Sequence, residues 1–221
     1  MPWTDQVIHF LDFEGSLASG VLEFGVVSLQ RGEVVATSTR LCAPHGPIRP
    51  SDTEVHGLSE ASLGGSAPMS DDWELFAGWR DRGPFAAHYA GVENSLLRAV
   101  WPYPRRSPDF ARPGESIVDW GPWIDTARLY AQFYPALDSG RLESLVAASG
   151  LQGELDALAH SRCPASRRRY HAALYDALAG ALLLISIGRQ PRLCDLTTTQ
   201  LLALSTLDPI KRESILQREL F

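Results

Sequence analysis

Three stretches in the first third of the chain carry the apolar pattern of β-strands. They are residues 7–13 (VIHFLDF), 21–30 (VLEFGVVSLQ) and 33–44 (EVVATSTRLCAP), with Gly-containing turns between them. Short runs rich in Val, Ile, Phe and Thr and bounded by turn residues are typical of strands. The pattern therefore predicts a meander of three strands.

The remainder of the chain alternates between strand and helix patterns. Helical spacing occurs at 71–83 and 92–100, and strand patterns occur at 84–90 and 122–129. Further helical segments are predicted at 127–135, 140–151, 167–185, 201–207 and 211–220. Strands first and alternation afterwards predict an α/β domain whose mixed sheet is flanked by helices.

Two segments without a regular strand or helix pattern interrupt this order of elements. Residues 44–68 read as a loop, and residues 101–118 contain four prolines and a glycine, which predict an inserted loop or irregular hairpin. We divide the chain into a domain of residues 1–190, with the insertion at about 101–118, and a helical C-terminal extension of residues 191–221.

Composition excludes several classes of protein. The 221 residues are 45% hydrophobic and 21% charged, as in ordinary globular proteins, and the net charge of −6 argues against a broad basic surface for coating nucleic acid. Cys42, Cys163 and Cys194 are odd in number and lack CxxC spacing, so neither a disulfide framework nor a thiolate zinc site is indicated. With no signal-peptide pattern and no apolar run approaching ~20 residues, we expect a cytoplasmic protein without a membrane segment.

The end of the first predicted strand carries two acids. Asp12 and Glu14 are two residues apart, so in a strand their side chains share one face and lie about 7 Å apart along the backbone. Two carboxylates this close repel each other, and burying them requires either protons or a cation. Solvated acids at a strand end are the simpler interpretation of this pair alone.

Two further pairs combine a histidine with an acid. His88 closes a predicted strand, and Glu93, five residues later, lies at the start of a predicted helix. His171 and Asp176 have the same spacing near the C-terminus. Five residues rotate a helix by 500°, which leaves two side chains about 140° apart. His171 and Asp176 can therefore reach one site only if His171 lies before the helix or in its first turn.

These residues form motifs that resemble a known family. DFE at 12–14, HYAGVE at 88–93 and HAALYD at 171–176 resemble, in order, the motifs of the histidine branch of the DEDD superfamily of 3′-5′ exonucleases. That branch includes proofreading subunits of bacterial replicative polymerases, ribonuclease T and oligoribonuclease. Segments LEFGVVSL, VHGLSEASL, WIDTARLY and RLESLVAASGL also resemble family segments, so the resemblance spans about residues 7–188.

The resemblance implies a fold and a site. The fold would be a ribonuclease-H-like sheet in which three antiparallel strands lead into parallel ones. Two Mg²⁺ or Mn²⁺ ions would hold the scissile phosphate and stabilise the leaving 3′ oxygen. Asp12 would bridge both ions, Glu14 and Asp176 would hold the first, Glu93 would support the second, and His171 would be the general base.

The chain departs from the family pattern near these residues. Glu93 stands where the family has Asp, and Tyr89 replaces the usual Asn of the middle motif. After Glu14, Ser16 keeps a hydroxyl that we expect to meet the terminal nucleotide. Arg167 and Arg168, just before His171, are expected to bind phosphates, although a solvated helix start explains them equally well.

The sequence therefore predicts a metal-dependent 3′-5′ exonuclease that acts on 3′ ends of single-stranded DNA or short RNA. The alternative is a weakly active or inactive module of the same fold that binds nucleic acid or a protein partner. An endonuclease on a related fold is a third option, which the spacing of His171 and Asp176 disfavours. For partners, we consider a homodimer or docking on a larger nucleic-acid-processing complex.

Overall fold

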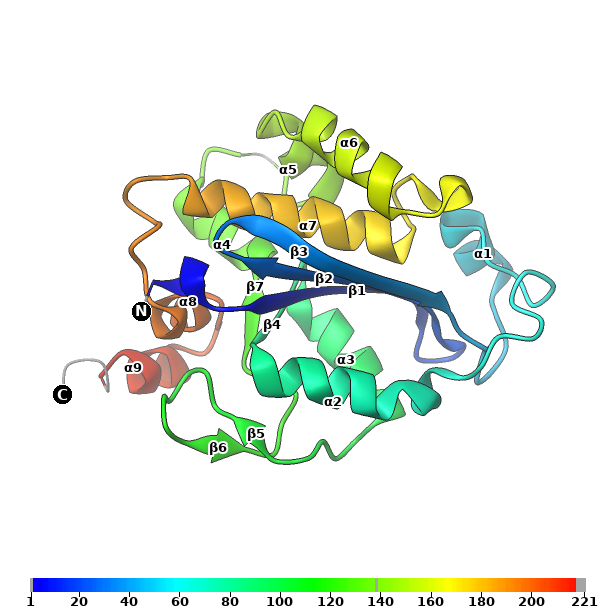
Figure 1. Cartoon of the computed structure of the whole chain (residues 1–221), viewed down its shortest axis with the longest axis horizontal. Coiled ribbons are helices and arrows are strands. Elements are labelled where there is room, and N and C mark those ends of the chain that lie inside the picture. Colours follow the sequence, from blue (N-terminus) through cyan, green and yellow to red (C-terminus); the bar gives the residue numbers. More distant parts are fainter. Residues whose placement is uncertain (1, 138, 218–221) are drawn as a thin grey trace.

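A mixed five-stranded sheet forms the centre of the computed structural model, which describes residues 2–137 and 139–217 (Figure 1). Its strands, in spatial order, are β3 (Glu33–Leu41), β2 (Gly20–Gln30), β1 (Ile8–Ser16), β4 (Phe85–Ala87) and β7 (Trp123–Asp125). β1, β2 and β3 pair antiparallel, while β4 and β7 continue the sheet in parallel. The predicted meander and the predicted mixed sheet are both confirmed.

Helices cover both faces of the sheet (Figure 1). On one face lie α4 (Thr126–Phe133), α5 (Leu142–Ala148), α6 (Gln152–Arg162) and the long α7 (Ala173–Gly188). On the other lie α2 (Trp73–Arg82) and α3 (Ala90–Val100). Short helix α1 (Pro50–His56) lies at one end of the molecule, and α8 (Thr198–Leu204) and α9 (Pro209–Gln217) lie at the other.

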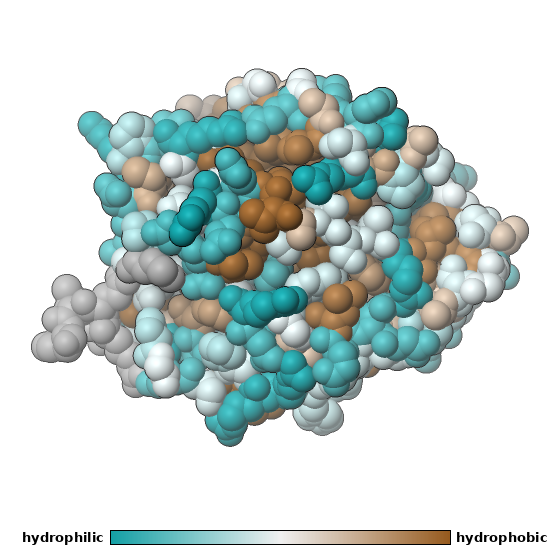
Figure 2. Space-filling view, in the orientation of Figure 1, coloured by the Kyte–Doolittle hydropathy of each residue, from teal (hydrophilic) through white to brown (hydrophobic). Residues whose placement is uncertain are grey.

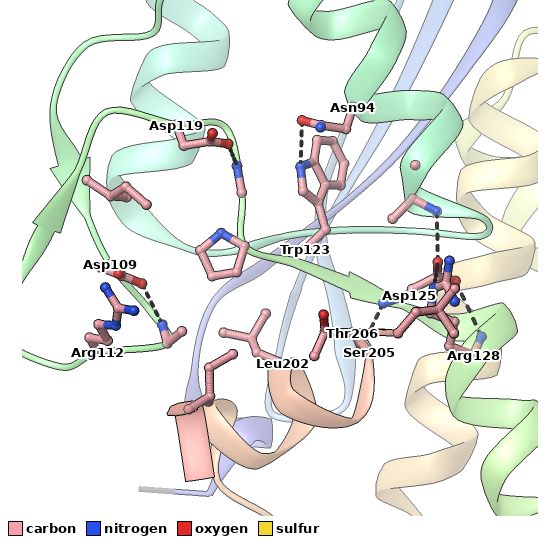
Figure 3. A pocket seen from close by; sticks show the side chains of 18 of the residues that line it. Asn94, Asp109, Arg112, Asp119, Trp123, Asp125, Arg128, Leu202, Ser205 and Thr206 are labelled. Atoms are coloured by element: carbon pink, nitrogen blue, oxygen red, sulfur yellow. Dashed lines mark hydrogen bonds and ion pairs between the residues drawn. The ribbon is translucent and has the colours of Figure 1, made fainter. Parts of the chain in front are cut away.

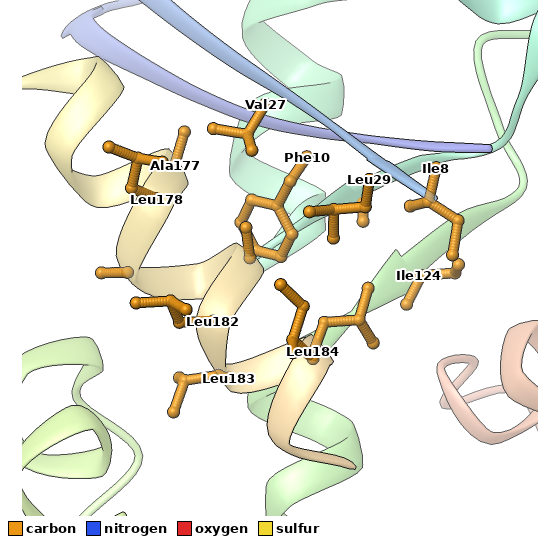
Figure 4. Packing of buried hydrophobic residues seen from close by; sticks show 14 of the residues in the cluster. Ile8, Phe10, Val27, Leu29, Ile124, Ala177, Leu178, Leu182, Leu183 and Leu184 are labelled. Carbon is orange, nitrogen blue, oxygen red and sulfur yellow. The ribbon is translucent and has the colours of Figure 1, made fainter. Parts of the chain in front are cut away.

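The face of the sheet beneath α7 is an aliphatic core. Ile8 and Phe10 alternate along β1 toward this side, where they belong to one cluster with Leu178, Leu182 and Leu184 of α7 (Figure 4). Because α7 is apolar around nearly its whole circumference, it is buried on all sides rather than along one stripe. Asp12 and Glu14 continue the face of Ile8 and Phe10, so the same alternation aims them at the start of α7.

Glycine allows α7 to approach the sheet closely at that point. A Cβ built on Gly25 of β2 would lie 2.3 Å from the backbone of Ala173, the first residue of α7. No other residue fits without moving the helix or the strand. Gly25 therefore fixes how near the first turn of α7 comes to the acidic end of β1, since Gly25 pairs with Asp12.

The opposite face is an aromatic core. Phe76 and Trp79 of α2 contact each other and Phe24 of β2 edge to face, with ring centroids 5.0–6.5 Å apart. Trp101 and Trp120 join the same cluster. The helical spacing read from Trp73 to Trp79 thus marks the buried side of α2.

The insertion is tied to this core by a buried arginine. It contains a two-stranded hairpin of β5 (Ser107–Pro108) and β6 (Ser116–Ile117). Arg80, only 1% exposed, donates to the carbonyls of Pro108, Trp120 and Gly121. The prediction of an irregular hairpin is therefore correct.

Two helices were not predicted. α1 lies inside the segment read as a loop, although Pro50 at its first position is a common helix start. α6 has weak apolar periodicity, so the sequence pattern did not predict a helix there.

The surface in Figure 2 is largely hydrophilic, with apolar side chains in separate patches. Among the described helices, none combines the length and apolarity required to cross a bilayer.

Candidate active site

Four carboxylates from three segments meet beside the end of β1. Asp12 and Glu14 come from β1, Glu93 from the first turn of α3 and Asp176 from the first turn of α7. Glu14, Glu93 and Asp176 are between 5 and 9% exposed. Segments separated by more than 150 residues thus bring together the acids that the sequence singled out.

Burial, together with repulsion from neighbouring carboxylates that include Glu23, raises the pKa of every one of these carboxyls. Burial is the largest cause in each case; it raises the pKa of Glu14 and of Glu93 to about 8 and that of Asp176 to about 7. For Asp12 the pKa rises well above its ordinary value, through burial and then through the charges of Glu93, Asp176 and Glu14. Without a cation, the ionised form of these carboxyls is therefore disfavoured at neutral pH.

The donor set suits a hard divalent cation. Within the described residues, neither Oε2 of Glu93 nor Oδ1 of Asp176 has a hydrogen-bond partner, although both atoms are buried. Buried polar atoms in native proteins normally have one, so their lack of a partner calls for a ligand. Carboxylate oxygens are what Mg²⁺ and Mn²⁺ prefer, and these residues fit such an ion.

His171 lies just before α7, as its spacing from Asp176 required. Its backbone N–H donates to Oδ2 of Asp176 at 2.9 Å, and its side chain is exposed. One potential ligand atom each from Glu14, His171 and Asp176 lie within 4.8 Å of one another. The imidazole is thus beside the carboxylates and accessible to solvent, where it can accept a proton or a cation.

Ser16 and Tyr89 lie next to the carboxylates in sequence. The Ser16 hydroxyl is in a turn with Ser19, whose N–H donates to it at 3.2 Å. Tyr89 has a positive φ of 62°, a conformation that suits Asn better than Tyr, and its hydroxyl donates to the Gly140 carbonyl. The ring is half-exposed, so it forms part of the surface near α3.

The two arginines expected to bind phosphate are held by other groups. Arg167 forms an ion pair with the buried Glu23, and Arg168 donates to the Cys163 carbonyl and contacts His160. These contacts favour structural roles over the phosphate contacts that the sequence suggested. The local sequence cannot reveal this, because the partner of Arg167 is 144 residues away.

Arg169 is a second arginine whose charge reaches the site, after that of Arg167. It is exposed, and its charge lowers the pKa of both Glu14 and Asp176 against the larger effect of their burial. Only one of its hydrogen bonds is short, a donation of 2.9 Å to the His56 carbonyl. Arg169 was not among the residues selected from the sequence, which were Arg167 and Arg168.

Asp125 was also missed. This buried residue ends β7, and its carboxylate accepts the N–H groups of Tyr89 and Ala90 at the start of α3 and of Ala127 in α4. It therefore caps two helices, one of which carries Glu93. An Asp before a helical run is a recognisable N-cap signal, so the sequence did contain this information.

A separate pocket of about 410 Å³ lies on a different face of α3 (Figure 3). Gly91, Asn94 and Arg98 line it from α3, and Leu202 and Ser205 line it from the C-terminal extension. None of the four carboxylates does. Ser205 also accepts the backbone N–H of Asp125, which links the extension to the strand that caps α3.

Solved structures that are similar to this chain include several exonucleases. Exonuclease X in complex with 5′ overhanging duplex DNA has a TM-score of 0.65 and 22% identity, and the match covers 90% of this chain and 99% of that chain. The nuclease domain of 3′hExo, a DEDDh family member bound to rAMP, has a TM-score of 0.60 and 14% identity over 89% of this chain and 97% of that one. A 3′-exonuclease recognising the histone mRNA stem-loop has a TM-score of 0.63 and 13% identity, covering 89% and 68%.

No protein-family model matches the chain, and no curated protein matches it in sequence. At these identities the structural matches establish the fold. The chain has the ribonuclease-H-like fold of DEDDh-type exonucleases, as the motifs led us to expect.

Proposed function

We propose that this protein is a metal-dependent 3′-5′ exonuclease that hydrolyses phosphodiester bonds at 3′ ends of single-stranded DNA or short RNA. The observation that carries this proposal is the convergence of Asp12, Glu14, Glu93 and Asp176 with His171 on a fold shared with exonucleases. Those four acids would hold two Mg²⁺ or Mn²⁺ ions, which when bound would neutralise charge on the scissile phosphate and the leaving oxygen.

The chain's own residues have distinct roles in this proposal. Asp12, between the other acids, would be shared by both ions, Glu14 and Asp176 would hold one, and Glu93 the other. His171, exposed beside Glu14 and Asp176, would take the proton of the attacking water. Ser16 stays a proposed contact for the terminal nucleotide, and Arg169 is a better-placed phosphate contact than Arg167 or Arg168.

The main alternative is an inactive module that keeps the fold to bind nucleic acid or a protein. The retained cluster argues against it, because repelling, buried carboxylates destabilise a protein that has no cation to bind them. Structural relatives are complexes with DNA in one case and with mRNA in another, so both substrates belong in the test. A cytoplasmic location, a homodimer and docking on a larger complex stay predictions.

Nucleotide release from 3′-labelled DNA and RNA oligomers, with Mg²⁺ or Mn²⁺, tests the proposal. We expect release from the 3′ end that stops with EDTA and in Asp12→Asn. Release that persists unchanged in the variant would come from a contaminant and would remove support for the enzyme. Rapid cleavage of a closed single-stranded circle would instead indicate an endonuclease.

A further inference from the structure

The loop between α6 and α7 carries His171 and needs support from elsewhere. Between Cys163 and Ala172 it contains only a single turn of 3₁₀ helix, Ala165–Arg167. His171 itself has a φ of 60°, in the left-handed region that a residue with a Cβ adopts only at a cost. Surrounding contacts must therefore hold this backbone conformation.

One guanidinium, on a side chain that is only 12% exposed, supplies those contacts. Arg167 donates through Nε and Nη2 to the two carboxylate oxygens of Glu23, which is 3% exposed. The same side chain donates from Nη1 to the His56 carbonyl at 2.6 Å and from Nη2 to the His171 carbonyl at 3.1 Å. A single side chain thus joins strand β2, the end of α1 and the backbone of His171.

Glu23 completes the support from the other side. It lies opposite Glu14 in the sheet, and its Oε2 also accepts the N–H of Ala173 at 3.1 Å, at the start of α7. Both of its oxygens are occupied by Arg167 and Ala173. Glu23 therefore differs from the neighbouring carboxylates, two of which have oxygens without partners.

Arg169, like Arg167, links the loop that carries His171 to the end of α1. Arg169 donates to the His56 carbonyl, and a Cβ at Gly57 would lie 2.5 Å from its Nη2 atom. Gly57 also has a φ of 74°, so glycine is needed there for two reasons. The His56–Gly57 turn is thus shaped to receive the loop that carries His171.

We propose that the Glu23–Arg167 pair is a positioning device for His171, and that Glu23 is not an additional metal ligand. The pair holds the His171 backbone in its left-handed conformation and so keeps the imidazole beside Glu14 and Asp176. This inference rests on the proposed function, in which His171 is the base.

The test replaces both partners with neutral residues of similar size, Glu23→Gln with Arg167→Met, so that no unpaired charge is left buried. We expect kcat to fall by about 10–100-fold, the range for losing a group that orients a site residue, while KM and Mn²⁺ affinity change less than 3-fold. In a His171→Ala background the same pair of changes should lower kcat no further, since residues that act through one another are not additive.

Asp72→Asn with Arg40→Met is the matched control. Arg40 also joins an acid to backbone carbonyls, those of Ala67 and Pro68, but it packs over Phe24 on the other face of the sheet. We expect this control to lose similar stability and to keep its kcat.

Hydrogen exchange of residues 165–172 separates this inference from the proposed function. Faster exchange there in the Glu23→Gln, Arg167→Met variant supports the positioning role even if the parent protein releases no nucleotide, a result that would overturn only the proposed activity. Unchanged exchange, an unchanged kcat in an active parent, or an equal further loss in the His171→Ala background would overturn the inference.

Discussion

Glu93 is the carboxylate at which the sequence departs from the motifs it resembles, and the structure shows how it joins the site. It is 5% exposed, and the Phe13 backbone N–H lowers its pKa against the larger effect of burial. Its charge is the largest electrostatic contribution, after burial, to the raised pKa of Asp12. The longer side chain therefore still places its charge within the cluster.

Removing that charge should weaken metal binding. Glu93→Gln keeps the size of the side chain but removes an anionic donor, so we expect Mn²⁺ affinity at pH 8 to fall by at least about 10-fold. Isothermal titration measures it directly. Glu33→Gln, at an exposed acid that begins β3, is the control, and equal affinities of the two variants would remove Glu93 from the metal site.

The arginines before α7 differ in what their side chains can reach, and single substitutions separate them. Arg169→Ala should raise KM for an oligonucleotide by several-fold and reduce the salt dependence of binding by about 0.7 in log–log slope, the value for one phosphate contact on a single strand. Arg168→Ala should change neither, because that guanidinium faces the Cys163 carbonyl and His160. Fluorescence anisotropy at several salt concentrations distinguishes the two, and the reverse order of effects would favour the original sequence prediction for Arg168.

At the scale of elements, the close contact between β2 and the start of α7 sets the geometry of the site. Gly25→Ala would place a methyl group 2.3 Å from the Ala173 backbone, so the first turn of α7 must move away. We expect a loss of about 1–3 kcal/mol in unfolding free energy and a fall in kcat larger than the stability loss explains, because Asp176 and His171 move with that turn. Urea denaturation and initial rates measure the two effects.

Gly180→Ala is a control for overpacking without displacement of the site. Its Cβ would lie 2.2 Å from the Phe10 ring, in the core near the middle of α7. It should destabilise the protein while leaving kcat within a few-fold. If both variants lose activity in proportion to stability, the β2–α7 contact has no special role in the site.

The elements predicted correctly from sequence are those whose own apolar pattern is long enough to identify them as strands or helices. The three strands and α7 carry long apolar patterns, and the sheet order then follows from the resemblance. α1 and α6 were missed because their helical character depends on packing rather than on periodicity. Local pattern therefore predicts where the central elements lie, while helices at the periphery need tertiary context.

The candidate site follows the same division. The types and order of Asp12, Glu14, Glu93, His171 and Asp176 were available from their motifs. The direction of each arginine was not, since Arg167 is held by a glutamate 144 residues away and Arg169 donates to the carbonyl of His56, which is also distant in sequence. Charge runs reveal that a basic segment exists, but the fold decides which of its members faces the substrate.

At the scale of the whole molecule, the cluster makes stability depend on pH in the opposite direction from ordinary acidic proteins. Salt-bridged carboxyls have lowered pKa values and stabilise a fold as pH rises. Here the pKa values of Glu14 and Glu93 are raised to about 8, and that of Asp176 to about 7. Between about pH 4.5 and 8 these three carboxyls therefore bind more protons in the folded protein than in the unfolded chain.

Stability without divalent cations should consequently fall as pH rises through this window, because the slope of unfolding free energy with pH has the sign of protons bound unfolded minus folded. We expect a loss of several kcal/mol between pH 5 and 8 in EDTA, and its reversal by Mg²⁺ or Mn²⁺, which bind the deprotonated carboxylates. Urea denaturation across this range measures it. Asp12→Asn with Glu14→Gln should flatten the dependence, because it removes two of the titrating carboxyls and also the Glu14 charge that raises the pKa of Glu93. A parent protein whose stability rises with pH in EDTA would show that the carboxylates are not packed as a repelling cluster.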